Sequence, residues 1–341
     1  MKTSPGEDKQ VMKKQIAASL LTLLAFAAFS PGVRAEELLL GGQTVGIEID
    51  SEGVIVSGFC AVETAEGSVS PAEDAGFALG DIIVRLDGSP VRDAEDFIGA
   101  VTKLGGREAE VGVVRAGREL ELRVRPALSE TRQWLMGMWL RDAVSGIGTV
   151  TFIEPESGVF GALGHSVNEE NTGHPVPLRQ GSICPAEIVS VSPGAPGSPG
   201  ELCGSSDESA PIGSVTRNTS VGIFGHLTVP AEGRRIQTGE LRPGEASILA
   251  TLSGHEARAY SAQIDRVYSD DGVTHALLTV TDGELTADAG GIVQGMSGSP
   301  IIQDGALVGA VTHVFVNDPR RGFAIGIYDM LGAANGTAQA A

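Results

Sequence analysis

The stretch from Gly295 to Phe315, GMSGSPIIQDGALVGAVTHVF, decides how the rest of the chain is interpreted. It holds two serines in a glycine-rich turn, followed by two apolar runs that meet at Asp304-Gly305. An Asp-Gly pair between apolar runs is a strong signal for a β-hairpin. The stretch therefore predicts either a nucleophile loop that leads into a strand lining a substrate groove, or a plain turn between two buried strands.

The composition favours a mainly β protein of more than one domain. The chain has 341 residues, which is enough for two modest cores. Aromatic residues make up only 4% and glycine reaches 47 residues, a mixture typical of many short strands and tight turns. The net charge of −19 argues against a nucleic-acid partner, because such a surface needs clustered Lys and Arg.

The N-terminal 35 residues read as a targeting segment. Four lysines precede an apolar run from Ile16 to Phe29, which is short for a membrane span and suits the core of a signal peptide. Val33-Arg34-Ala35 fits a cleavage site. Residues 1–35 are therefore predicted to be a signal peptide or an N-terminal membrane anchor, and the protein is expected to be exported across the cytoplasmic membrane.

Residues 36–126 resemble a PDZ domain of the kind found in bacterial periplasmic proteases. The resemblance rests on SPAEDAGFALGDIIVRLDGSPV, followed by an amphipathic helix and a hairpin that turns at Ala116-Gly117. PDZ domains bind an extended peptide as an added strand. The resemblance implies that the peptide-binding loop includes Val45, Gly46 and Ile47.

After a linker at residues 127–133, residues 134–341 alternate like strands and predict a barrel-like second domain. GIGTVTFI and GVFGALG form a hairpin that ends at His165, and the turn-rich residues 192–211 predict a long surface loop. Among the three cysteines, Cys184 and Cys203 could close this loop as a disulfide, or all three could be free thiols.

The motif around Ser297 supplies what a nucleophilic serine requires. Gly295 lets the backbone turn so that the N–H groups of Gly295 and Ser297 converge as an oxyanion hole, and Gly298 leaves space beside the serine. G-x-S-G-[GS]-P is the motif of chymotrypsin-like peptidases. That resemblance implies a double β-barrel peptidase domain, in which the strand containing Thr312 and His313 lines the substrate groove.

Six histidines compete for the role of general base. His165 follows a hairpin upstream of the serine, as in chymotrypsin-type enzymes. GIFGHLTV around His226 echoes GALGHSV, so the residues alone leave both open. A metal site built from His165, two glutamates and His174 lacks any recognised ligand spacing, so no metal and no cofactor are expected. No acid stands out where such enzymes usually carry one; Asp282 precedes Ser297 by only fifteen residues.

Taken together, GMWLRDAVSGIGTVTF, FGALGHSV and GIVQGMSGSPIIQDGALVGAVTHVFVNDP resemble the stage IV sporulation protein B peptidases of endospore-forming bacteria. The resemblance implies a catalytic triad of His165, Asp282 and Ser297.

It also implies a serine endopeptidase in the space between forespore and mother cell. Such an enzyme cuts itself near its N-terminus, which the PDZ domain is expected to recognise. It then cleaves a membrane-associated regulator and so activates a late sporulation transcription factor. The alternatives are an exported quality-control protease of broad specificity and a catalytically inactive PDZ scaffold.

Overall fold

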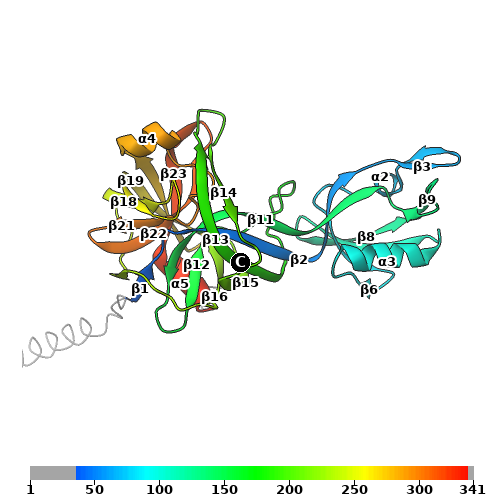
Figure 1. Ribbon diagram of the computed structural model, residues 1–341, viewed down its shortest axis with the longest axis horizontal. Helices are drawn as coiled ribbons and strands as arrows, with labels where there is room; N and C mark the ends of the chain where they lie inside the picture. Colours follow the sequence, from blue (N-terminus) through cyan, green and yellow to red (C-terminus); the bar gives the residue numbers. More distant parts are fainter. Residues whose placement is uncertain (1–35, 337–341) are drawn as a thin grey trace, which may run out of the picture. The chain divides into compact units, whose positions relative to one another are not determined.

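The computed structural model describes residues 36–336 (Figure 1). The predicted signal peptide or anchor at residues 1–35 lies outside the described residues. Within residues 36–336, no helix is both long and apolar enough to cross a bilayer. Strands dominate the described part of the chain and form two barrels and a smaller sheet with helices.

Six antiparallel strands close the first barrel, because the two long strands β2 and β11 pair with each other at its seam. Around the ring the strands are β2 (Thr44–Phe59), β11 (Met138–Ile153), β12 (Val159–Ala162), β16 (Gly222–Leu227), β15 (Gly213–Thr219) and β13 (Leu178–Ser192). Their inward side chains, among them Ile49, Phe160 and Ile183, are fully buried. Three short strands extend this sheet: β1 (Glu37–Leu40), β17 (Arg235–Gln237) and β14 (Glu201–Ser206).

A second closed barrel contains the C-terminal third of the chain. Its order is β18 (Gly244–Ala250), β19 (Arg258–Asp270), β20 (Val273–Val280), β23 (Asp318–Gly326), β22 (Ala306–Phe315) and β21 (Pro300–Gln303). Helix α4 (Gly283–Ala289) follows β20, and α5 (Ile327–Ala334) packs against strands of both barrels. The predicted turn between β21 and β22 is confirmed, since Asp304 and Gly305 both have positive φ. The chymotrypsin-like double barrel predicted from the sequence is thus confirmed.

A smaller α+β unit occupies the region predicted to be a PDZ domain. Its strands are β3 (Val62–Thr64), β4 (Gly67–Val69), β5 (Ile82–Leu86), β6 (Ser89–Pro90), β7 (Ala109–Arg115) and β8 (Arg118–Val124), and its helices are α2 (Pro71–Asp74) and α3 (Ala94–Leu104). Asp93 caps α3 by accepting a hydrogen bond from the Asp96 amide, and Gly105 ends the helix in the left-handed region. Buried residues of α3, such as Phe97 and Val101, pack on the apolar face of this sheet.

The boundary between these units differs from the predicted one. Residues 44–51 of β2 pair with β13 and β11 in the first barrel, whereas residues 54–59 of the same strand belong to the PDZ sheet. Gly53, with a φ of 110°, lies between the two halves, where a Cβ would meet the Ile83 carbonyl oxygen at 2.4 Å. Strand pairing therefore assigns residues 37–51 to the barrel. The predicted linker at residues 127–133 lies within a short hairpin of β9 (Ala127–Leu128) and β10 (Trp134–Leu135).

Two further expectations about the chain are settled by its geometry. Cys60, Cys184 and Cys203 are all free thiols, since Cys184 lies opposite Gly46 and Cys203 lies opposite Ser190. The predicted loop at residues 192–211 contains a strand, β14, that pairs with β13. The turn-forming residues of this segment favoured a loop. A strand still forms, because its hydrogen bonds to β13 require only main-chain groups.

Asp81 holds the turn between α2 and β5 in place. Its side chain is fully buried, accepts hydrogen bonds from Arg115 Nε at 2.6 Å and Nη2 at 2.7 Å, and accepts another from the Ala78 amide. Asp81→Ala leaves the Ala78 amide without its acceptor and leaves the Arg115 guanidinium with only the Gly76 carbonyl. We expect a loss of about 3 kcal/mol in the free energy of unfolding, measured by urea denaturation.

The matched control for this variant is Asp96→Ala, which removes an exposed ion pair with Arg92. Its urea midpoint should stay close to that of the unaltered protein. Equal midpoints for the two variants would contradict the structural role assigned to Asp81.

Candidate active site

The loop around Ser297 is clamped between the two barrels. From the first barrel, the Thr149 amide donates to the Ser297 carbonyl at 2.9 Å, and the Thr149 hydroxyl donates to the Gly295 carbonyl at 2.9 Å. The Thr151 hydroxyl, which is fully buried, donates to the Gly298 carbonyl at 2.8 Å. These hydrogen bonds engage the loop carbonyls of residues 295, 297 and 298 and fix the backbone there.

Gly298 is required by the first barrel rather than by a substrate. Its φ is 92°, and a Cβ there would meet the Thr149 carbonyl oxygen at 2.0 Å and the Leu163 amide nitrogen at 2.5 Å. The sequence interpretation, in which a small residue leaves space for a substrate, is therefore corrected. Strand β11 and the end of β12 occupy that space.

The two serines of the motif have different surroundings. Ser297 is half-buried, lines a cavity and donates a hydrogen bond from Oγ to the Thr312 carbonyl at 2.7 Å. Ser299 is fully buried, and its hydroxyl has no hydrogen-bond partner within the described residues. Only Ser297 is accessible to a ligand.

The backbone amides of Gly295 and Ser297 belong to the same loop as the Ser297 hydroxyl. Neither amide donates a hydrogen bond to any described residue, whereas the Met296 amide between them donates to the Val293 carbonyl and the Gly298 amide to the Val311 carbonyl. Gly295 has a φ of 93°, which a side chain would strain. Two free amides beside a serine hydroxyl are the donors that an oxyanion requires.

His165 enters the same cavity from the end of β12. Leu163 and Gly164 both have positive φ, and this turn directs the chain toward β22. The imidazole Nδ1 lies 2.7 Å from the Ser166 carbonyl oxygen. Since a carbonyl only accepts, Nδ1 carries the proton and Nε2 keeps a lone pair. Desolvation lowers the pKa of His165 below its ordinary value, and the hydrogen bond to Ser166 opposes this effect.

Asp282 is not brought to His165. Its Oδ1 accepts hydrogen bonds from the amides of Glu284 and Leu285 in the first turn of α4, and its Oδ2 accepts from the Ser261 amide. These amides, led by that of Leu285, lower the pKa of Asp282. The carboxylate is thus the N-cap of α4, and no hydrogen bond joins it to His165 within the described residues.

The rival histidines lie away from the cavity. His226 is exposed on β16, His174 Nδ1 lies beside the Thr172 carbonyl, and His255 Nδ1 lies beside the Ala186 carbonyl. His275 stacks on Tyr268 with ring centroids 5.6 Å apart. The geometry therefore favours His165 over His226, a choice that the residues alone had left open.

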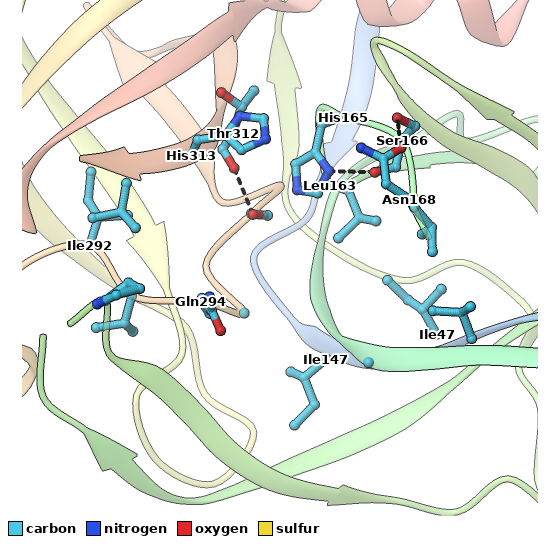
Figure 2. A pocket seen from close by; sticks show the side chains of 18 of the residues that line it. Ile47, Ile147, Leu163, His165, Ser166, Asn168, Ile292, Gln294, Thr312 and His313 are labelled. Carbon is cyan, nitrogen blue, oxygen red and sulfur yellow. Dashed lines mark hydrogen bonds between the residues drawn. The ribbon is translucent and has the colours of Figure 1, made fainter. Parts of the chain in front are cut away.

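The cavity has a volume of about 600 Å³ and mostly apolar walls (Figure 2). Thr312 and His313 line it, as the sequence predicted for the substrate groove. The aliphatic residues of the wall, which the motifs did not reveal, are Ile47, Val144, Ile147, Leu163, Val167, Ile292, Val293, Val314 and Val316. Among the lining residues the titratable side chains are the two histidines, His165 and His313. Within residues 36–336, no carboxylate, lysine or arginine side chain contributes to the lining.

The residues assigned to the PDZ peptide loop belong to the first barrel instead. Val45 is buried in the barrel core, and Gly46 lies against Ser206, where a Cβ would come within 2.3 Å of the serine Cβ. Ile47 pairs with Ile183 and Gly146 and lines the cavity beside His165. The alternation in TVGIEID predicted a strand correctly, but it carried no information on which sheet the strand joins.

Comparison with protein families gives two matches along the chain. Residues 132–331, more than half of the chain, match the family described as SpoIVB peptidase S55. Residues 52–125 match the PDZ domain family. A curated Bartonella henselae protein, provisionally named as a zinc metalloprotease, is 34% identical over 94 residues. That match covers 27% of this chain and 26% of the relative, so the chain spans about a quarter of that relative's length.

Solved structures with similar folds share little sequence with this chain. The inactive form of the Rv3671c protease of Mycobacterium tuberculosis is 14% identical, covers 57% of this chain and 85% of its own, and gives a TM-score of 0.35. Its active form is 17% identical, with 58% and 77% covered and a TM-score of 0.34. The PDZ domain of the SdrC-like protein Lmo2051 of Listeria monocytogenes is 20% identical, with 27% and 90% covered and a TM-score of 0.22.

The capping role of Asp282 can be separated from a catalytic one. Asp282→Asn keeps an oxygen acceptor at the N-cap, so kcat should stay within a few-fold of the unaltered enzyme. Asp282→Ala should lower the free energy of unfolding by about 1 kcal/mol through loss of the cap. A carboxylate that orients a catalytic histidine instead costs on the order of 10⁴-fold in kcat when replaced by its amide. A loss of that size in Asp282→Asn, measured by steady-state kinetics, would restore the triad implied by the sequence.

Proposed function

Because the chain belongs to the SpoIVB peptidase S55 family and is a serine peptidase, we propose that it is an exported signalling endopeptidase of sporulation, either released or membrane-anchored. It cuts itself near the N-terminus and then cleaves a membrane-associated regulatory protein in the space between forespore and mother cell. This cleavage signals the activation of a late sporulation transcription factor. The observation that carries the proposal is the shared cavity of Ser297, His165 and the two free amides.

The proposed chemistry is acyl transfer through Ser297. At rest the hydroxyl proton is held by the Thr312 carbonyl. An extended substrate lying along β22 donates its own amide to that carbonyl, which frees the hydroxyl to turn toward Nε2 of His165. His165 accepts the proton as Oγ attacks the peptide carbonyl, and it then returns the proton to the leaving amine. The amides of Gly295 and Ser297 stabilise the oxyanion.

The walls of the cavity support a preference for apolar side chains. Ile292 is almost fully buried and is one of the aliphatic residues that line the cavity. Such a lining accepts apolar side chains and leaves a charged one without a partner. This favours few, defined cuts over the broad degradation expected of a quality-control protease.

Replacement of each serine in turn tests the proposed nucleophile. Ser297→Ala should abolish fluorophosphonate labelling and self-cleavage, because it removes the only motif hydroxyl that lines the cavity. Ser299→Ala is the matched control and should retain both, since the Ser299 hydroxyl has no hydrogen bond to lose. Mass spectrometry of the N-termini gives the self-cleavage readout.

The opposite pattern, with Ser297→Ala processed and Ser299→Ala inert, would overturn the assignment of the nucleophile. An unaltered protein that neither labels nor processes itself would support the inactive scaffold. Degradation of unfolded casein at many sites would support the quality-control protease.

We also propose that the PDZ unit recognises the protein's own N-terminal segment, and afterwards its target, by strand addition. Of the two edges of its sheet, β8 is mostly exposed and charged. The other edge is the first part of β11, residues 138–141, which pairs only with β2 among the described strands and packs near α3. Met136 and Gly137 just before it are buried, yet their amides donate no hydrogen bond to a described residue. These features support β11, rather than residues 45–47, as the strand that accepts a peptide.

Two leucines of equal exposure distinguish the edges. Leu135, beside the free amides, and Leu120, on β8, are both 38% exposed. The probe is a fluorescein-labelled peptide of residues 25–36, and the protein is a Ser297→Ala chain beginning at Glu36. Leu135→Asp should weaken binding by about tenfold in fluorescence anisotropy, equivalent to about 1.4 kcal/mol, while Leu120→Asp should not. Equal affinities for the two variants would contradict recognition at β11.

A further inference from the structure

Two histidine side chains share the active-site cavity, and the proposed chemistry uses only one of them. His313 projects from β22, directly after Thr312, whose carbonyl holds the Ser297 hydroxyl. The ring centroids of His165 and His313 are 4.6 Å apart, with 32° between the ring planes. Figure 2 shows the two imidazoles next to each other at the cavity. Consecutive residues of β22 therefore contact the serine and the histidine of the site.

His165 lacks the partner that usually restrains a catalytic imidazole. In a Ser-His-Asp arrangement, a carboxylate on Nδ1 fixes the ring and its tautomer. Here Nδ1 donates to the Ser166 carbonyl, which selects the tautomer, and no carboxylate of the described part of the chain lines the cavity. This hydrogen bond to the adjacent residue is a single contact, and it does not by itself fix the orientation of the His165 ring. The ring of His313, tilted by 32° against that of His165, is the further contact that restrains the imidazole.

The charge state of His313 is compatible with such a contact. Desolvation first, and then repulsion by a charged His165, lower the pKa of His313 below its ordinary value. It is therefore neutral at neutral pH and does not repel the imidazolium that forms on His165 during the reaction. Among the residues that the structure describes, no acidic or basic side chain from the other lining elements faces the pair.

We infer that His313 is a positioning residue, whose ring packs against that of His165, holds it in its reactive orientation and shields it from water. This inference rests on the proposed role of His165 as general base. The stacking face of the ring performs this role, so an aromatic ring without nitrogen can replace it. The function differs from that of a groove wall, which acts on the substrate.

Two replacements of His313 separate stacking from the other roles. His313→Ala removes the ring, so kcat should fall on the order of 10- to 100-fold through misplacement of the base, with a smaller change in KM. The lost shielding should also move the acid limb of the pH–rate profile upward, toward the ordinary histidine value of 6.5. His313→Phe keeps a ring in the same place, so it should recover most of the kcat that His313→Ala loses and should reverse the shift of the acid limb.

The other stacked histidine supplies the matched control. His275→Ala and His275→Phe make the same changes in the pair of His275 and Tyr268, outside the cavity. They should leave kcat and the pH profile unchanged. Thermal melts of all four variants establish that each is folded.

An NMR titration measures the change in the pKa of His165 without relying on enzyme activity. In a Ser297→Ala background, the His165 ring resonance, assigned by its loss in His165→Gln, should titrate at higher pH when His313→Ala is added and not when His313→Phe is added. Loss of activity in His165→Ala tests the proposed base separately, so failure of the base and failure of the stacking are distinguishable.

Three outcomes would overturn the inference. The first is a His313→Ala enzyme with an unchanged kcat or an unchanged acid limb. The second is a change confined to KM, which would make His313 only a wall of the substrate groove. The third is a His313→Phe enzyme as defective as His313→Ala, which would require an imidazole nitrogen rather than a stacked ring.

Discussion

The close approach of β11 to the loop around Ser297 is the constraint on which the site depends. A main-chain carbonyl of Thr149 occupies the position that a side chain at residue 298 would need. Because no side chain separates the two backbones, the hydrogen bonds from Thr149 and Thr151 can reach the loop carbonyls directly. The loop carbonyls at 295, 297 and 298 are thereby engaged, while the amides at 295 and 297 remain free. The loop thus has these three acceptors engaged and two amide donors available.

This constraint also explains why the cavity lies where the barrels meet. The Ser297 loop leads into β21 of the second barrel, whereas His165 follows β12 of the first. Neither barrel contains both groups, so their juxtaposition depends on the packing between barrels. Gly164 contributes to this packing, since a Cβ there would come within 2.9 Å of the Thr312 side chain. The positive φ of Leu163, unfavourable for a branched residue, is the local strain that accompanies this turn.

Features encoded locally were predictable from the sequence, and features that depend on distant partners were not. Glycines on both sides of Ser297, the Asp304-Gly305 turn and the hairpin before His165 follow from the preferences of adjacent residues. The resemblance implied that Asp282 belongs to a catalytic triad with His165, but a resemblance transfers a residue's role without the contacts around that residue. In this chain the nearby amides of α4 satisfy the carboxylate first. Likewise, nothing local in residues 45–47 distinguishes a strand of the PDZ sheet from a strand of the barrel, since both alternate in the same way.

The long strands β2 and β11 run from the PDZ unit into the first barrel and connect the PDZ sheet to the candidate active site by continuous backbone. Residues 138–141 of β11 border the PDZ sheet, residues 144–147 line the cavity, and residues 149–151 hold the Ser297 loop. The same continuity explains why a sequence boundary between the two domains is misleading: the two strands that pass from one unit to the other are also the strands that build the site.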